Sequence, residues 1–337
     1  MTHEYIVRET GEVVQERLFG NRTLRALYST ELENTAWLCR AASSRRITDL
    51  LGYLNYDNLL SSRLLGMSGF LRDSGIDPGE FVEPPESLDT LRKIFGRKIK
   101  YWECRPLPGA EQAVTCPADS RMTLGEITDL SFLPVKNKFF DCAELLGGSR
   151  SGWTDHFEGG CYAMFRLTPE KYHYSHVPVS GIVEDFYAVE GRYHSCNPNA
   201  VVQLLNPYSK NRRVVTILST DTEGGSDVGL VAMVEVVALM VGRIEQCYSE
   251  FKYDNPRPVQ KSMRLLIGAP KAVFLPGSST IILLFQKGRI QFSDDLVRNQ
   301  RRRDVRSRYS TSIGQVLVET DVMARSPLAT SAKRSLS

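Results

Sequence analysis

From about Val114 onward the chain consists of short apolar runs separated by turn-forming residues, and this pattern limits the fold more than any other feature. The runs are rich in β-branched and aromatic residues, as in "GGCYAMFRL", "AVVQLL", "RRVVTILST", "STIILLF" and "RIQF". Gly, Pro, Asn and Asp lie between them, and no helical pattern of useful length intervenes. This spacing favours an antiparallel β domain, sandwich-like or barrel-like, over a parallel α/β sheet.

The first hundred residues show a different pattern. Apolar residues recur at mixed spacings of three and four in "TLRALYSTELENTAWLCRAASSRRITDLLGYL", which predicts helices. After a loop rich in Pro, Gly and acidic residues, "LDTLRKIFGRKI" predicts one more short helix. We therefore expect an α+β protein, with a helical N-terminal layer over residues 1–100 and a mainly antiparallel β domain over 101–310. Residues 311–337 would hold the end of this domain and a polar tail, "SPLATSAKRSLS", which we expect to be disordered.

Composition and charge are those of a globular protein without a strong overall field. The chain has 337 residues, of which 42% are hydrophobic and 24% charged, and its formal net charge is +3. No nucleic-acid partner is expected on this basis. One tract, Arg298–Arg308, holds six arginines in eleven residues. Such a tract is more often solvated surface than a site for an anionic partner, and the sequence leaves its role open.

The sequence also bears on where the protein works. Its seven cysteines are far apart and form no CxxC pair, so neither a disulfide framework nor a zinc site is predicted. We expect small buried thiols in a reducing compartment. The longest apolar run, residues 228–242, is too short to span a bilayer and contains Glu235, which indicates two joined strands or one strand with an exposed face. The N-terminus has no signal-peptide pattern. These features predict a cytoplasmic protein whose membrane contact, if any, is peripheral.

Few residues could carry chemistry, and each is ambiguous when taken singly. His173 and His176 lie three apart in "EKYHYSHVP", where two histidines are more often structural than catalytic, and no third metal ligand is nearby. Asp119 in "CPADSRM" is by itself a turn former. Ser278 and Ser279 follow a Pro-Gly turn and precede an apolar strand. No GxSxG, P-loop or strand-linked GxGxxG motif is present, so a serine hydrolase or nucleotide-binding protein is not supported.

The order of these segments resembles that of the phosphatidylserine decarboxylase family, over most of the chain. The resemblance rests on "TGEVVQERLFG", "GIDPGEFVEPPESLDTLRKIFGRKI", "CPADSRM", "KNKFFDCAELLGG", "FRLTPEKYHYSHVPVSG", "YHSCNPNAVV", "KNRRVV", "VAMVEVVALMVGRI" and "GSSTIILLFQKGRIQFSDDLVRN". Each segment is weak evidence alone, whereas together and in this order they are specific. The resemblance implies a proenzyme that cuts itself and generates its own pyruvoyl cofactor, with no metal.

The implied chemistry begins with a serine hydroxyl that attacks the carbonyl of the preceding residue and forms an ester. Elimination then splits the chain into a long β chain and a short α chain, and the new N-terminus of the short chain becomes the pyruvoyl group. This ketone forms a Schiff base with the substrate amine and takes up the electrons left when CO2 departs. The serine needs a base within hydrogen-bond reach, and the base needs a third group to orient it.

Four residues match the family's functional positions by motif. His176 matches the base, and Asp119 matches the carboxylate that would orient it and favour its protonated form. His173 matches a second histidine near the substrate. Ser279 matches the serine that becomes the pyruvoyl group, because it precedes a threonine and the strand register fixes where it points. The cut would then fall between Ser278 and Ser279, although counting from the glycine would favour Ser278 as the nucleophile.

The chain departs from the family pattern around the second histidine. Lys171 stands where the family has aspartate, Tyr174 where it has arginine, and Ser180 where it has aspartate. Ser278 also replaces the more common glycine. Arginine is a natural partner for a carboxylate or phosphate, and tyrosine is not. We therefore expect any change in substrate handling to involve Tyr174 and His173.

The leading hypothesis is conversion of phosphatidylserine to phosphatidylethanolamine and CO2, with peripheral membrane contact. Trp37, Leu38, Leu50 and Leu51 could supply an interfacial face, although arginines interrupt it. One alternative is a soluble decarboxylase of a free, for example aromatic, amino acid. Another is an uncut, non-catalytic homologue that serves as a binding or scaffold protein. Family members often pair, so a homodimer of processed units is expected.

Overall fold

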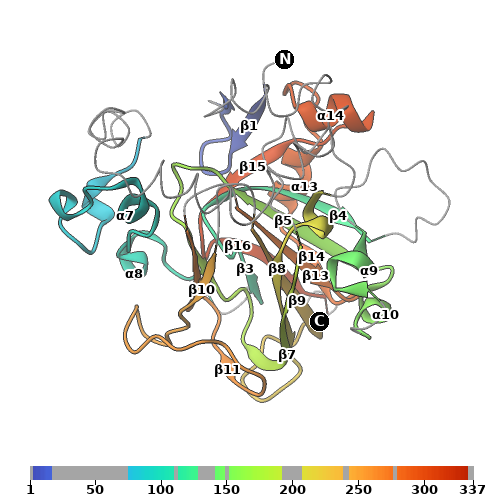
Figure 1. Ribbon diagram of the computed structural model, residues 1–337. Coiled ribbons are helices and arrows are strands. Elements are labelled where there is room, and N and C mark those ends of the chain that lie inside the picture. The colour runs from blue at the N-terminus through green and yellow to red at the C-terminus, as the bar shows by residue number, and fades with distance from the viewer. Residues whose placement is uncertain are drawn as a thin grey trace, which may run out of the picture.

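The computed structural model describes residues 3–16, 75–109, 113–127, 141–148, 152–191, 207–237, 243–275 and 279–332, and these residues form a mainly β protein (Figure 1). The largest sheet has ten strands in the order β11-β7-β8-β9-β13-β5-β4-β15-β1-β2. Along the chain these strands are β1 Glu4–Val7, β2 Val13–Gln15, β4 Ser120–Glu126, β5 Cys161–Leu167, β7 Gly181–Val189, β8 Arg213–Ser219, β9 Leu230–Val237, β11 Arg264–Leu265, β13 Ser279–Phe285 and β15 Glu319–Val322.

Two smaller antiparallel sheets complete the β structure. One has the order β10-β12-β6 and the other β14-β16-β3. Their strands are β3 Val114–Thr115, β6 Tyr174–His176, β10 Ile244–Gln246, β12 Pro270–Phe274, β14 Ile290–Phe292 and β16 Pro327–Ser331. Strands β1 and β15 pair in parallel, so the large sheet is mixed, while the other strand pairs of the described residues are antiparallel. The mainly antiparallel β domain expected from the sequence is thus confirmed at this coarser level.

The helices of the described residues are short. They are the 3-10 helices η2 Pro78–Glu80 and η3 Pro85–Ser87, and the α-helices α7 Leu91–Phe95, α8 Tyr101–Cys104, α9 Cys142–Leu145, α10 Thr154–Phe157, α12 Pro207–Lys210, α13 Asp294–Gln300 and α14 Arg308–Ile313. Figure 1 places α7 and α8 on one side of the sheets and α9 and α10 on the other. Helix α7 confirms the short helix expected from "LDTLRKIFGRKI". Within the described ranges, no helix has the length and apolar character needed to cross a bilayer.

The two ends of the chain differ from the sequence expectation. Residues 4–15 are not helical, because they form a hairpin that adds β1 and β2 to the large sheet and turns at Gly11, whose φ is 72°. Residues 17–74, which include the proposed interfacial face, lie outside the described residues. The sequence predicts a disordered tail, but Pro327–Ser331 is strand β16, with Leu328 and Ala329 fully buried.

The register of the central strands decides which residues share a face. Ser279 in β13 lies opposite Leu167 of β5 and Val237 of β9, and Ile281 lies opposite Glu235. Directly opposed residues point to the same face, and so do residues two apart on one strand. Ser279 and Glu235 therefore share one face of the large sheet. All seven residues of β13 are buried, as in a strand covered on both faces.

The small sheet β10-β12-β6 covers the Ser279 face. Lys271 of β12 donates from Nζ to Oε2 of Glu235 at 2.6 Å, and Ser175 of β6 donates to Oε1 at 2.7 Å. Both members of the ion pair have fully buried side chains. Glu235 thus neither joins two strands nor lies on an exposed face, because its partner is supplied by a strand far along the chain.

Candidate active site

Ser279 is the first residue of β13 and is fully buried. Its Oγ has no hydrogen-bond partner among the residues that the structure describes. A buried hydroxyl left without a partner costs about 1–3 kcal/mol, and Thr280, the next residue of the strand, shares this state with Ser279. Residues 276–278, and with them Ser278, lie outside the described part of the chain.

His176 ends β6 and is also fully buried. Its ring is held through both nitrogens. Nδ1 lies 2.8 Å from the carbonyl oxygen of Gly268, and Nε2 lies 3.0 Å from the hydroxyl oxygen of Tyr172. The backbone N–H of His176 donates to the carbonyl of Pro117 at 2.7 Å. These contacts place the imidazole beside the turn that carries Asp119.

Asp119 precedes β4, and its carboxylate is bound by an arginine that the sequence did not predict. Arg105 donates to it from Nε at 3.0 Å and from Nη2 at 2.8 Å, and the backbone N–H of Ala324 donates at 2.7 Å. Arg105 also pairs with Glu80 at 2.8 Å. Burial by itself would raise the pKa of Asp119, but the Arg105 guanidinium, together with Lys171 and the Ala324 N–H, outweighs it and lowers the pKa. Asp119 is therefore ionised near neutral pH.

The charge state of His176 differs from the sequence expectation. Burial is the largest influence and lowers the pKa of His176 to about 4, and Arg325 and Arg105 act in the same direction. Asp119 and the carbonyl of Gly268 raise it, but not enough to compensate. Asp119 thus acts in the expected direction without favouring the protonated form, and the ring is oriented by Gly268 and Tyr172 rather than by Asp119.

Tyr174 begins strand β6, and His173 immediately precedes it. His173 is fully buried, its Nδ1 lies 2.7 Å from the carbonyl oxygen of Lys171, and its ring centroid lies 4.6 Å from that of Phe95. The backbone carbonyl of His173 accepts a hydrogen bond from the N–H of Phe274 at 3.0 Å, and Phe274 lies five positions before Ser279. The Tyr174 ring stacks on Tyr172 with centroids 5.5 Å apart.

The structure places His176 beside the turn of Asp119, and His173 just before β6, a strand of the small sheet that covers the Ser279 face. No hydrogen bond joins Ser279 to His176 within the described residues. Sequence reasoning missed Arg105, which binds Asp119, and Tyr172, which contacts His176 and is itself bonded to Tyr253. It also missed that Glu235 pairs with Lys271 on the Ser279 face. Glu235 carried a signal, since a carboxylate inside an apolar run predicts a buried cation. Nothing in the sequence identifies Tyr253.

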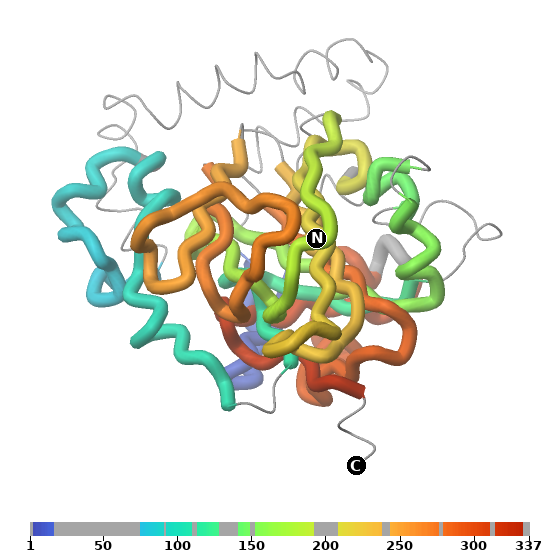
Figure 2. The backbone as a smooth tube through the Cα atoms, turned by 90° about the horizontal axis from the view of Figure 1, so that it is seen from below, coloured from blue at the N-terminus to red at the C-terminus, as the bar shows by residue number. Residues whose placement is uncertain are grey.

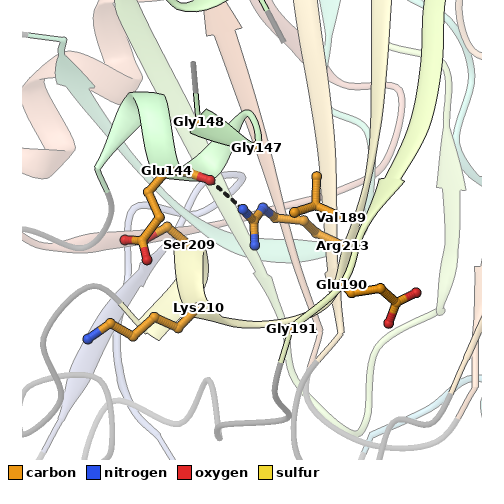
Figure 3. A pocket seen from close by; sticks show the side chains of 9 residues that line it. All are labelled: Glu144, Gly147, Gly148, Val189, Glu190, Gly191, Ser209, Lys210 and Arg213. Carbon is orange, nitrogen blue, oxygen red and sulfur yellow. Dashed lines mark hydrogen bonds between the residues drawn. The ribbon is translucent and has the colours of Figure 1, made fainter. Parts of the chain in front are cut away.

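A pocket of about 740 Å³ lies on the opposite face of the sheet. It is lined by Glu144, Gly147, Gly148, Val189, Glu190, Gly191, Ser209, Lys210 and Arg213 (Figure 3). Arg213 lies opposite Val236, and Val236 lies opposite Thr280. Thr280 and Ser279 are adjacent on β13 and point to opposite faces, so the Arg213 side chain points away from the Ser279 face. Its guanidinium donates to the backbone carbonyls of Glu144, Leu145 and Asn211 and thereby supports the wall of the pocket. This pocket is therefore separate from the predicted catalytic residues.

A family model described as phosphatidylserine decarboxylase matches residues 91–315. A phosphatidylserine decarboxylase proenzyme of Chlamydia trachomatis is 30% identical over 296 residues, which cover 87% of this chain and 90% of that protein. A Chlamydia muridarum proenzyme is 29% identical, with 92% and 96% covered. Proenzyme 2 of Oryza sativa subsp. japonica is 37% identical over 231 residues, 67% of this chain but only 34% of that longer protein. The chain belongs to the phosphatidylserine decarboxylase family.

Proposed function

We propose that this protein is a pyruvoyl-dependent carboxy-lyase that decarboxylates phosphatidylserine after cutting its own chain between Ser278 and Ser279. One observation carries the assignment of the serine. Ser279 opens the central strand β13 with a fully buried hydroxyl that has no partner among the described residues. A serine hydroxyl that is shielded from solvent and not engaged in a hydrogen bond is free to attack the carbonyl of the preceding residue.

The surroundings of Ser279 suit a small ketone group. Leu167 and Val237 lie opposite it on the two neighbouring strands and exclude water. The pyruvoyl group, once formed at residue 279, supplies an electron-withdrawing ketone for the departure of CO2. His176 is neutral near neutral pH, as a base must be before it accepts a proton, and His173 lies beside the strand that leads to Ser279.

The test is the intact mass of the purified protein under denaturing conditions. The wild-type chain should give two fragments, residues 1–278 and residues 279–337, the second with a blocked N-terminus. Ser279→Ala should give a single full-length mass, because alanine has no nucleophile.

Ser278→Ala is the matched control, since it changes the neighbouring hydroxyl only. It should still be cut if Ser279 is the nucleophile. If Ser278→Ala is uncut and Ser279→Ala is cut, the serine assignment moves by one position. A single uncut mass for the wild-type chain would contradict self-processing and leave the binding or scaffold hypothesis.

The substrate is tested on the processed protein. CO2 release from phosphatidylserine in liposomes should exceed release from free serine or aromatic amino acids. The reverse order would favour the soluble amino-acid decarboxylase. The same sample gives the oligomeric state by light scattering, where we propose a dimer of processed units. Flotation with liposomes tests the proposed peripheral contact.

A further inference from the structure

His176 ends a chain of hydroxyl groups that comes from a distant part of the sequence. The hydroxyl oxygen of Tyr172 lies 3.0 Å from Nε2 of His176 and 2.8 Å from the hydroxyl oxygen of Tyr253. The Tyr253 hydroxyl in turn donates to the carbonyl of Ile99 at 2.9 Å and accepts from the Ile99 N–H at 3.1 Å. Figure 2 shows the segment 75–109 beside the segment 243–275, which is how Ile99 reaches Tyr253.

The partners of the imidazole fix its tautomer. The carbonyl of Gly268 can only accept, so Nδ1 must carry a proton, and Nε2 of the neutral ring must accept from Tyr172. Gly268 has no proton to give. In this arrangement, therefore, Tyr172 is the one partner of the ring that can both donate a proton and accept one.

The hydroxyl groups of Tyr172 and Tyr253 can give every donor a hydrogen-bond acceptor in either charge state of His176. When the ring is neutral, Tyr172 donates to Nε2, and Tyr253 donates to Tyr172 or to the Ile99 carbonyl. When the ring is protonated, Nε2–H donates to the Tyr172 oxygen, Tyr172 donates to the Tyr253 oxygen, and Tyr253 donates to the Ile99 carbonyl. The two arrangements differ only in the positions of hydrogens, and the oxygen and nitrogen atoms stay in place.

We infer that Tyr172 and Tyr253 are positioning residues for His176, and that their hydroxyl chain lets the buried imidazole take up and release a proton by reversing its direction. In the uptake step the Tyr172 O–H bond breaks as the Nε2–H bond forms, Tyr172 regains a proton from Tyr253, and Tyr253 takes one from a hydronium ion of the solvent, which is left as water. In the release step the same bonds break and form in reverse. This role rests on the proposed function, in which His176 is the base.

The other groups around His176 cannot adjust in this way. The Tyr101 ring meets it edge-on with centroids 4.9 Å apart, and Arg325 lies over that ring. Arg325 and Arg105 carry fixed positive charges that oppose protonation, and Asp119 favours protonation but is already bound by Arg105. The hydroxyl chain is thus the neutral part of the surroundings that can respond to a change of charge.

The test uses the full-length Ser279→Ala chain, so that it does not depend on self-cleavage. The ring nitrogens of His176 are followed by nitrogen-15 NMR during a pH titration. Tyr253→Phe removes the acceptor that Tyr172 needs when the ring is protonated, and the protonated form loses about one hydrogen bond. The pKa of His176 should fall by about half a unit to one unit.

Tyr101→Phe is the matched control, because its ring also touches His176 while its hydroxyl donates to the Lys252 carbonyl, outside the chain. It should leave the His176 titration in place. Tyr172→Phe should move the titration in the same direction as Tyr253→Phe and serves if Tyr253→Phe does not fold. An unchanged pKa in both chain variants, or an equal shift in the control, would overturn the inference.

A second readout is the rate of self-cleavage against pH in newly translated chains that retain Ser279. Tyr253→Phe should lower the rate several-fold and move its acid limb to lower pH, whereas a packing defect would lower the rate alone. Absence of cleavage in the wild-type chain would contradict the proposed function and leave the NMR result standing.

Discussion

Two buried polar clusters flank the central strands, one held together by ion pairs and the other by hydrogen bonds between uncharged groups. The N-terminal salt-bridge cluster consists of His3, Glu16, Arg121, Arg166 and Glu319. Arg166 of β5 donates to Glu319 of β15 at 2.6 Å and to Glu16 at 2.9 Å, and His3 lies 2.7 Å from Glu319. Arg166 faces Thr280, so this cluster lies on the face of the sheet away from Ser279.

The histidine–tyrosine cluster consists of His176, Tyr172 and Tyr253. It has no formal charge when His176 is neutral, and it is joined by hydroxyl groups rather than by ion pairs. Burial raises the pKa of both tyrosines, so they stay protonated. Its bonds can reverse direction at little cost.

The difference separates a structural role from a chemical one. In the N-terminal cluster the carboxylates and the His3 ring lie close enough to resemble a metal site, with ligand atoms within 4.8 Å of one another. Two arginines already bind these carboxylates, however, so the charge is balanced by the protein itself. Burial would raise the pKa of Glu319, but Arg166 and His3 together outweigh it and lower the pKa. Such a cluster holds β1 and β2 on the sheet, and any change of charge in it is costly.

The largest expected effect comes from breaking the N-terminal cluster. Arg166→Met leaves Glu319 buried without its main partner, and removing one member of a buried ion pair costs about 3–5 kcal/mol. The measurement is the free energy of unfolding in urea, on the full-length Ser279→Ala chain.

Arg257→Met provides the comparison, because the Arg257–Glu250 pair is more than half exposed and should contribute little. In a chain that retains Ser279, Arg166→Met should leave the acid limb of self-cleavage unmoved. A cost below about 1 kcal/mol would mean that the buried arginine is not balancing the carboxylates.

A smaller effect is expected from the histidine–tyrosine cluster as pH falls. His176 has a folded pKa of about 4 against an ordinary value of 6.5, so the unfolded chain binds more protons between these values. The stability that neutral His176 contributes to the folded state is complete above about pH 6.5. It is lost as the pH falls toward about 4, a change of about 3 kcal/mol in the free energy of unfolding. His176→Asn in the Ser279→Ala chain should flatten the fall in stability over this window. An equally steep fall would assign the acid sensitivity to other groups, such as His3, whose pKa burial also lowers.

The sequence predicted the strands better than the contacts between them. The segments Arg213–Ser219 and Ser279–Phe285 are apolar, β-branched runs with clear ends, and both form strands. Residues near the N-terminus were misassigned because four-residue and three-residue strands carry too few positions to show a period, and their pairing with β15 is set by the fold.

The same limit applies to the candidate site. Asp119, His173, His176 and Ser279 were identified through motifs, which are local in sequence. Their partners are not local: Tyr253 lies 81 positions after Tyr172. Whether Asp119 binds His176 or Arg105 depends on how α8 packs, and no local pattern reports that. Motifs could therefore propose the site residues, whereas their hydrogen-bond partners and the charge state of His176 were not predictable from the sequence.

The smallest net effect is expected from a double substitution at a pair that shares features of both clusters. The Glu235–Lys271 pair is charged and buried like the N-terminal cluster, but it lies on the face of Ser279. Lys271→Met alone leaves Glu235 uncompensated and should cost about 3 kcal/mol. Lys271→Met combined with Glu235→Leu should recover most of this loss and end within about 1–2 kcal/mol of the parent, since only the hydrogen bonds of Ser175 and Gln246 remain unmade.

Self-cleavage of the double variant then decides whether the Glu235–Lys271 pair is structural or takes part in the chemistry. The pair is neutral as a unit, so its removal changes the local field at Ser279 little, and the double variant should still be cut. Urea unfolding and intact mass on the same samples give both answers. A stable double variant that no longer cuts itself would show that a charged pair can also belong to the chemistry, and the division between charged structure and neutral site would fail at this position.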